Sequence, residues 1–292
     1  MEGRIIKGIA GFYYVACEDG VIYECKAKGV FRKDHKKPLV GDRVTVDVVD
    51  AQTATGNVTS LLPRVNELLR PAVANVDQAV IIFATTHPEP NMSLLNRFLV
   101  RMEFEKIPTV ICFNKSDLMG ESEKADLRAN FAHTPYPVLF TCAKTGEGLE
   151  ELKQCLAGKV STVAGPSGVG KSSLINCLQS ETVMETGTVS KKAERGRHTT
   201  RHAQLLPLDK ETYIFDTPGF SSLELSELDE EDVMLAFPEI AVFQGKCKFP
   251  DCTHIHEPGC KCKEALSSGG IASQRYEDYV AFYEECKGHA KW

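Results

Sequence analysis

Long hydrophobic runs are absent from this sequence of 292 residues. A helix that crosses a membrane needs roughly 20 consecutive apolar residues, and no run here approaches that length. The N-terminal residues Met-Glu-Gly-Arg-Ile-Ile also lack the basic stretch and the apolar core of a secretory signal. We therefore expect a cytoplasmic protein with no membrane partner.

An overall basic charge is missing as well, since the formal net charge is −6 at pH 7. Taken alone, this value argues against a nucleic-acid partner. The sum hides two strongly basic segments, residues 26–43 and 191–201, while the acidic excess lies mainly after residue 220. Because phosphate affinity depends on such local patches, the charge pattern remains compatible with an RNA partner.

A disulfide framework is not indicated either. The cysteines number 11, an odd count, in a chain without a predicted signal peptide. Most of them are scattered, but four lie close together at the C-terminal end: Cys247, Cys252, Cys260 and Cys262. In this context a cysteine cluster is more typical of a metal site than of disulfide bonds.

Residues 1–68 are rich in short β-strand patterns. Three valines between residues 44 and 48 alternate with polar residues, which is the period of a half-buried strand. Residues 11–15 and 21–25 flank Glu-Asp-Gly, a plausible hairpin turn. Short strands without a helical pattern predict a small β-barrel, and an OB-like barrel is one candidate.

The predicted barrel carries a basic loop from Lys26 to Lys37, with Phe31 inside it. Lysine and arginine would neutralise RNA phosphates, and the aromatic ring would stack on a base. A solvated basic loop is the other interpretation, and this segment alone leaves both open.

Residues 69–224 have the pattern of an α/β domain. Apolar runs at 76–84 and 109–113 are typical of buried parallel strands, and residues 91–106 have the periodicity of an amphipathic helix. We expect a mostly parallel sheet, with ligands bound beyond the carboxyl ends of its strands.

The segment Gly165–Ser172 fits the motif G-x-x-x-x-G-K-[ST], between a strand pattern and a helical pattern. Backbone N–H groups and the helix N-terminus would bind a polyphosphate there. Lys171 would reach the β- and γ-phosphates, and the Ser172 hydroxyl would bind Mg²⁺. The residues assigned to this loop are Gly165, Pro166, Ser167, Gly168, Val169, Gly170, Lys171, Ser172 and Ser173.

The motif N-K-x-D follows the strand at 109–113 and indicates guanine recognition. The Asp117 carboxylate can accept hydrogen bonds from guanine N1–H and the exocyclic amine, a donor pair that adenine does not present. Asn114 would bond the purine edge and tie loops together, and the Lys115 stem would pack on the base. The full motif is Asn114, Lys115, Ser116 and Asp117.

A second guanine loop follows the strand pattern at 137–141. Cys142, Ala143 and Lys144 resemble the S-A-K motif, in which a backbone N–H contacts guanine O6, with cysteine in place of the usual serine. Because the Ala143 amide would still contact the base, we expect a modest loss at most.

The magnesium and γ-phosphate groups are predicted after the P-loop. Either Thr199 or Thr200, in the basic segment, would sense Mg²⁺ and the γ-phosphate. In the D-x-x-G motif, Asp216 would hold Mg²⁺ through water and the Gly219 amide would contact the γ-phosphate.

The order of these motifs is unusual. GTPases run P-loop, switch threonine, D-x-x-G, N-K-x-D and S-A-K, whereas this chain begins with N-K-x-D and ends with D-x-x-G. The same strands in a shifted order predict a circular permutation, which close termini permit. The chain then leaves the nucleotide domain at Phe220, so a movement dependent on the γ-phosphate would pull on the C-terminal domain.

Phe220 also occupies the position where many GTPases have a glutamine that orients water. A phenyl ring forms no such hydrogen bond, so we expect slow hydrolysis without a partner. His198 is the best candidate for orienting water; a contact with RNA, or simple exposure, is the alternative role for this side chain.

The C-terminal residues 225–292 contain the pattern Cys-x₄-Cys-x-His-x₅-Cys, formed by Cys247, Cys252, His254 and Cys260. Three thiolates and one imidazole fit a closed, tetrahedral and structural Zn²⁺ site. Cys262 and His256 are rival ligands. A helix at 273–287 is also predicted, with an aromatic face that we interpret as core.

Together these motifs closely resemble the bacterial GTPases that depend on the small ribosomal subunit, the RsgA or YjeQ family. The resemblance covers nearly the whole chain. It rests on Lys28-Gly-Val-Phe-Arg-Lys33, Asn114-Lys-Ser-Asp117, Gly165–Ser173, Gly196-Arg-His-Thr-Thr200, Asp216-Thr-Pro-Gly-Phe220 and the zinc pattern. Cys142 is the one departure.

The resemblance implies an OB-fold domain, a permuted GTPase domain and a zinc domain. It implies binding near the decoding region of the small subunit late in assembly, and hydrolysis that the subunit stimulates. It favours Cys247, Cys252, His254 and Cys260 over the rival ligands and places the family's switch histidine at His198. We expect a monomer. A GTP-dependent adaptor for another protein, and a P-loop kinase or ATPase, are the alternatives.

Overall fold

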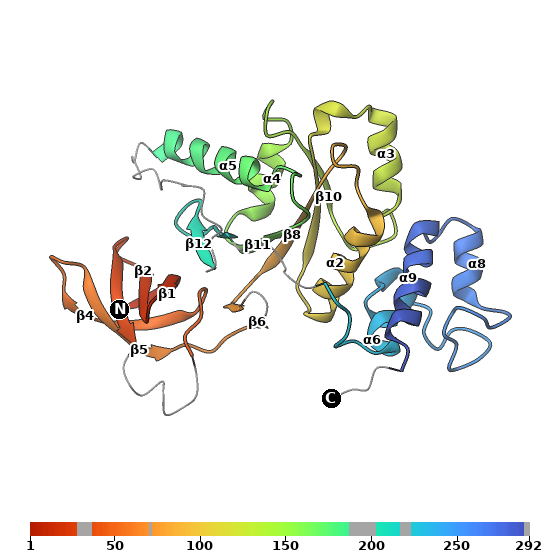
Figure 1. Ribbon diagram of the computed structural model, residues 1–292, viewed down its shortest axis with the longest axis horizontal. Helices are drawn as coiled ribbons and strands as arrows, with labels where there is room; N and C mark the ends of the chain where they lie inside the picture. Colours follow the sequence, from red (N-terminus) through yellow and green to blue (C-terminus); the bar gives the residue numbers. More distant parts are fainter. Residues whose placement is uncertain (28–36, 70–71, 187–202, 217–222, 289–292) are drawn as a thin grey trace. The chain divides into compact units, whose positions relative to one another are not determined.

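The computed structural model describes residues 1–27, 37–69, 72–186, 203–216 and 223–288 (Figure 1). The chain divides into two compact units. The first contains Met1–Ala79, Lys153–Ala164 and Ile175–Ser221, and the second contains Val80–Leu152, Gly165–Leu174 and Ser222–Trp292. In the described part of the chain, no helix combines the length and the apolar character needed to cross a membrane.

Five strands of the first unit close into a barrel. They are β1 (Glu2–Ile9), β2 (Phe12–Cys17), β3 (Ile22–Ala27), β4 (Arg43–Asp50) and β5 (Thr55–Leu61). Strand β1 pairs with β2, β2 with β3, β3 with β5, β5 with β4, and β4 with β1. The prediction of an OB-like barrel is therefore confirmed.

Buried side chains at alternate positions of the strands fill the barrel. Val44 and Val46 of β4 are buried, while Asp47, the next residue along the strand, is exposed. The turn from β2 to β3 is the predicted hairpin: Cys17 N donates to Val21 O at 3.0 Å, and Gly20 has a φ of 81°. Glycine adopts this left-handed conformation without the steric cost that a side chain brings.

Further strands of the first unit continue from the barrel. Strand β12 (Gln204–Pro207) pairs antiparallel with β13 (Tyr213–Asp216), which pairs parallel with β11 (Val160–Ala164). Strand β12 also meets β1, through the pair Lys7 and Gln204. The strand pattern before the P-loop is confirmed as β11, whereas β12 was not predicted from the sequence.

A two-stranded ribbon follows the barrel, where the sequence indicated only a connector. Strands β6 (Glu67–Leu69) and β7 (Ala72–Ala74) pair antiparallel. Arg64 binds the fully buried Asp42 with its Nε and Nη2 atoms at 2.7 and 2.8 Å. Asp42 directly precedes β4 and Arg64 follows β5, so this partly buried ion pair links the barrel to the segment that leads into the ribbon.

The second unit contains β10, β9 and, from Val80 onward, β8, and these strands lie in the order β10, β9, β8. Strands β8 (Gln78–Ala84) and β9 (Thr109–Asn114) are completely buried, as their apolar runs predict, and β10 (Val138–Thr141) is parallel to β9. The helices between the strands are α2 (Met92–Phe104), the short helix η1 (Ser116–Leu118) and α3 (Glu121–Ala129). Helix α4 (Leu149–Leu156) and helix α5 (Lys171–Thr186) flank β11 in sequence.

The C-terminal residues form four helices in the described part: α6 (Glu230–Leu235), α7 (Pro238–Ala241), α8 (Lys261–Ser267) and α9 (Ser273–Cys286). Phe237, Tyr279 and Phe282 are buried in their core. The predicted aromatic face at 273–287 is therefore core, as expected.

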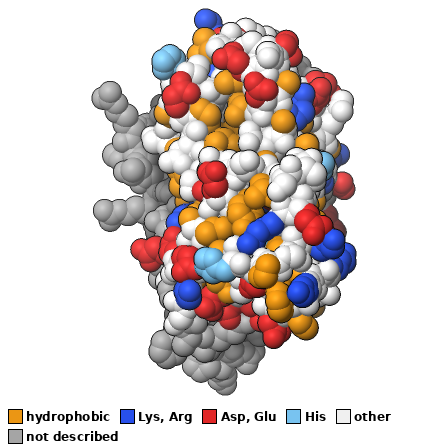
Figure 2. Space-filling model, turned by 90° about the vertical axis from the view of Figure 1, so that its right-hand side faces the viewer, with side chains coloured by type: hydrophobic (Ala, Val, Ile, Leu, Met, Phe, Trp, Pro, Cys, Tyr) orange, Lys and Arg blue, Asp and Glu red, His pale blue; other side chains and the backbone are white. Residues whose placement is uncertain are grey.

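Figure 2 looks onto the side on which α8 and α9 lie in Figure 1. Apolar side chains run down the middle of this face, and acidic as well as basic side chains border them (Figure 2). Proteins that bind nucleic acid present a surface of one dominant, positive charge. The described side chains on this face instead carry both signs.

Candidate nucleotide site and metal cluster

Asn114 joins the three loops that the sequence assigns to the nucleotide. It ends β9 and is buried, with 2% of its surface exposed. Its Nδ2 atom donates to Val169 O in the P-loop at 2.8 Å, and its Oδ1 atom accepts from Ala143 N at 3.4 Å. The segments 114–117, 142–144 and 165–173 therefore lie together in the second unit.

Lys115 adds a second connection to the P-loop. Its ammonium group donates to Gly168 O at 3.0 Å and also to His87 O. The residue itself has a φ of 63° and a ψ of 37°, the left-handed conformation that L residues adopt rarely. The side chain thus lies between the P-loop and the turn after β8.

Asp117 and Cys142 form a direct contact. Cys142 Sγ donates to Asp117 Oδ1 at 3.0 Å, and the thiol is buried while the carboxylate residue is exposed. Cysteine in place of serine thus keeps a donor on the carboxylate predicted to contact guanine. The neighbouring Ser116 is fully buried, whereas Lys144 is exposed.

The P-loop depends on its glycines. Gly165, with a φ of 138°, approaches β8 so closely that an added Cβ would lie 1.9 Å from Ile82 O. A Cβ at Gly170 would lie 2.3 Å from Asn114 Nδ2. Val169 is buried and anchors the loop, while Ser167 and Gly168 face solvent. Gly165 and Gly170 therefore have no room for a side chain.

Lys171 begins helix α5 and turns toward the loop. Its Nζ atom donates to Gly165 O at 2.7 Å and to Pro166 O at 2.6 Å. Burial lowers the pKa of Lys171 from its usual value. Ser172 and Ser173 follow in the first turn, and both are exposed.

The predicted magnesium and catalytic groups are only partly within the described structure. Asp216 ends β13 and is in register with Gln204 of β12. His198, Thr199, Thr200, Gly219 and Phe220 lie outside the described residues. The same holds for most of the two basic segments.

A second cluster lies in the C-terminal region. The ligand atoms of Cys247, Cys252, His254 and Cys260 all lie within 4.8 Å of one another. His254 Nδ1 is 3.5, 3.5 and 3.4 Å from the three sulfur atoms. Burial lowers the pKa of His254, which favours the neutral imidazole that binds a metal. Three sulfurs and one imidazole nitrogen at these separations could hold a metal ion.

The rival ligands are not part of this cluster. Cys262 is buried in α8, and burial raises the pKa of its thiol to about 12. His256 is exposed, and its backbone N–H donates to Glu257 Oε2 at 3.1 Å. The structure thus groups the four residues that the family spacing favoured.

Two tyrosines of α9 support the metal loop. Tyr276 Oη donates to His254 O at 2.8 Å, and Tyr279 Oη donates to Thr253 O at 2.5 Å. His254 has a φ of 65°, so these bonds hold a backbone that is left-handed. Helical periodicity predicted these tyrosines only as core, because the partner of a hydroxyl is not visible in the spacing of residues along a helix.

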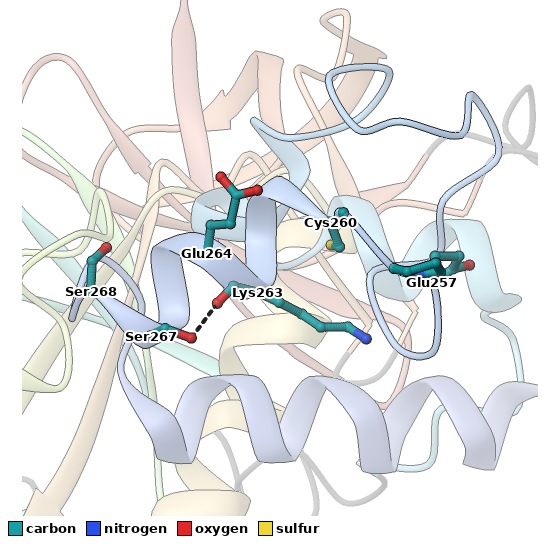
Figure 3. A pocket seen from close by; sticks show the side chains of 8 residues that line it. Glu257, Cys260, Lys263, Glu264, Ser267 and Ser268 are labelled. Atoms are coloured by element: carbon teal, nitrogen blue, oxygen red, sulfur yellow. Dashed lines mark hydrogen bonds between the residues drawn. The ribbon is translucent and has the colours of Figure 1, made fainter.

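A cleft of about 560 Å³ lies beside the metal cluster (Figure 3). Ser267 Oγ donates to Lys263 O at 2.9 Å on one side of it. Its lining consists of Glu257, Pro258, Gly259, Cys260, Lys263, Glu264, Ser267 and Ser268. None of the nucleotide loops lines this cleft.

The fold and the loops define the class of protein. A P-loop after β11 and two guanine-type loops after β9 and β10, in permuted order along the chain, are the parts of a circularly permuted P-loop GTPase. Comparison with known proteins agrees: the profile of the RsgA GTPase family matches residues 61–226, and that of the RsgA N-terminal domain matches residues 2–55. The chain belongs to the RsgA GTPase family, and it is a GTP hydrolase.

Individual relatives match over the full length. A protein of Agathobacter rectalis named small ribosomal subunit biogenesis GTPase RsgA is 51% identical, with 100% of both chains covered. A protein of the same name from Caldanaerobacter subterraneus is 48% identical, over 100% of this chain and 97% of the other.

Two solved structures are also similar. YjeQ from Thermotoga maritima has 38% identity and a TM-score of 0.83, with 98% of each chain covered. YloQ, described as a circularly permuted GTPase, has 35% identity and a TM-score of 0.80, over 98% of this chain and 94% of the other. The predicted family, fold class and permutation are thereby confirmed.

Proposed function

We propose that this GTPase acts in the biogenesis of the small ribosomal subunit. The observation that carries the proposal is the contact of Asn114 with Val169 and Ala143, since it assembles a phosphate loop and two guanine loops into one site. The names of the full-length relatives supply the process.

Roles in the nucleotide site follow from the chemistry of the residues. Asp117 accepts from the guanine N1–H and amine, and the Ala143 N–H donates to O6. The backbone of 165–173 and the Lys171 ammonium bind the phosphates. When bound, Mg²⁺ neutralises charge that develops on the phosphates.

The groups for magnesium and water belong to this proposal as well. Ser172 and Asp216 hold Mg²⁺, together with Thr199 or Thr200, and the Gly219 N–H contacts the γ-phosphate. His198 orients the attacking water, since Phe220 offers no hydrogen-bonding atom. Hydrolysis is therefore slow until a partner places His198.

Zn²⁺ is the ion that the C-terminal cluster fits best. Cys247, Cys252, His254 and Cys260 supply four ligands and leave no position for a substrate, as in structural zinc sites. The metal stabilises the loop between α7 and α8. Residues 1–68, 69–224 and 225–292 are the barrel, GTPase and zinc domains of this proposal.

The partners in this proposal are GTP, GDP, the small subunit and its rRNA. The basic segments at 26–43 and 191–201 bind rRNA phosphates. The protein acts as a monomer in the cytoplasm. RNA binding of this kind weakens steeply with salt, because counterions are released from the phosphates.

The test is GTP turnover with and without purified small ribosomal subunits, at two salt concentrations. We expect strong stimulation by small subunits at low salt and little by large subunits at equal concentration. At low salt, equal turnover without subunits, with small subunits and with large subunits would overturn the ribosomal role. It would favour a GTP-dependent adaptor for another protein.

A further inference from the structure

Thr85, which directly follows β8, contacts two consecutive carbonyl groups of the N-K-x-D loop. Its backbone N–H donates to Asn114 O at 2.8 Å, and its Oγ1 atom donates to Lys115 O at 2.7 Å. The side chain is fully buried. A strand next to β9 thereby fixes the backbone where that loop begins.

The carbonyl of Lys115 also starts the turn that carries Asp117. Leu118 N donates to the same oxygen at 3.0 Å and closes the helix η1. Lys115 is left-handed at this point, and a non-glycine residue keeps such a conformation only when its surroundings hold it. The Thr85 hydroxyl is one of the groups that hold it.

The other contacts of the loop fix different atoms. Asn114 is bound through its side chain, and Lys115 Nζ contacts the carbonyls of His87 and Gly168. Cys142 Sγ fixes one oxygen of Asp117. Among the side chains of the described residues, Thr85 supplies the bond to the main chain of Lys115.

We propose that Thr85 is a positioning residue of the guanine site: its buried hydroxyl fixes the left-handed backbone of Lys115 and, through η1, the direction of the Asp117 carboxylate. This inference rests on the proposed guanine-binding role of Asp117. Thr85 does not contact the nucleotide in this mechanism.

The test compares three variants in the full-length protein. Thr85→Val removes the hydroxyl at nearly constant shape, and Thr85→Ser retains it. Thr162→Val is the matched control, because Thr162 is also fully buried but its hydroxyl has no hydrogen-bond partner within the described residues. Melting temperatures establish that each variant is folded, and Thr85→Ala replaces Thr85→Val if the latter does not fold.

The readout is the dissociation constant for GDP and for inosine diphosphate, which lacks the exocyclic amine that Asp117 contacts. We expect Thr85→Val to weaken GDP binding about tenfold and inosine diphosphate much less, so that the preference for guanine falls. Thr85→Ser and Thr162→Val should keep the wild-type preference.

Several outcomes would overturn the inference. They are unchanged GDP binding in Thr85→Val, an equal loss for both nucleotides, and a Thr85→Ser variant that behaves like Thr85→Val. If the wild-type protein itself does not prefer GDP to inosine diphosphate, the guanine role of Asp117 fails first. If it does prefer GDP and Thr85→Val retains that preference, only the role of Thr85 fails.

Discussion

Asn96 on α2 donates a hydrogen bond to Asp278 on α9 at 2.6 Å, and both side chains are buried. Arg275 Nη1 donates to Asn96 Oδ1 at 3.0 Å, and Arg275 Nε is 2.6 Å from Glu239 Oε1. A buried polar network of this kind is favourable only when its members are satisfied. It anchors the C-terminal helices to α2, a helix of the GTPase domain.

The first prediction concerns this network. Arg275→Met leaves the buried Glu239 carboxylate without its ion pair, which should cost about 3–5 kcal/mol in the free energy of unfolding. Urea denaturation measures this loss. The control is Lys261→Met, which removes an exposed ion pair with Glu264 and should change stability by less than about 1 kcal/mol. Similar losses in both variants would contradict the assigned role.

The second prediction concerns the metal cluster. Purified protein should contain one zinc ion per chain, and Cys252→Ser should lose it, because a thiolate ligand is removed. Cys262→Ser should retain the ion, since Cys262 lies outside the cluster. Mass spectrometry under native conditions measures the content. A structural zinc ion can supply on the order of 10 kcal/mol, so chelation should also lower the melting temperature.

The third prediction concerns Cys142. Cys142→Ser should bind GDP at least as well as the wild type, because the hydroxyl is a better donor to Asp117 than the thiol. Cys142→Ala removes the donor and should weaken binding by about 0.5–1.5 kcal/mol. Titration with fluorescent GDP measures both. Equal binding by Cys142→Ala and Cys142→Ser would show that the contact does not matter.

The fourth prediction concerns base selection. Asp117→Asn replaces an acceptor by an amide that can donate, so it should bind GTP at least about 100-fold less tightly and should prefer xanthosine triphosphate. The matched control is Asp126→Asn, an exposed position on α3 that should keep the preference for GTP. An unchanged preference in Asp117→Asn would refute the assigned base contact.

The fifth prediction concerns hydrolysis. His198→Ala should bind GTP normally but lose about 10²–10⁴-fold of the turnover that small subunits stimulate, the usual range for a general acid or base. His133→Ala removes an exposed histidine and serves as the control. Single-turnover measurements separate hydrolysis from product release. Full stimulated turnover in His198→Ala would exclude the catalytic role.

Local motifs made most of the site predictable. Residues 114–117 and 165–173 form motifs of fixed spacing, because each motif is expected to bind the ligand within one loop, so the sequence alone locates them. The alternation of Val44 and Val46 with polar residues likewise predicted a strand of the barrel, because every second side chain of such a strand is buried. The order of the motifs then predicted the permutation.

Features that depend on distant partners were not predictable. Asn96 and Asp278 are 182 residues apart, and a polar residue on a helix gives no sign that it will be buried. Strand β12 has four residues and no motif at its end, whereas β10 and β13, which are equally short, each lead into a nucleotide motif. Thr85 belongs to no motif, and its role becomes visible only when Lys115 O is placed beside its hydroxyl.

The pairing of Lys7 with Gln204 has a consequence for synthesis on the ribosome. Strand β1 emerges about 200 residues before its partner β12, and contacts between such distant segments form slowly. The nascent chain can therefore complete the ring of β1 to β5 long before β12 covers β1 at Lys7. Chaperones that recognise exposed strand edges would have this interval in which to bind.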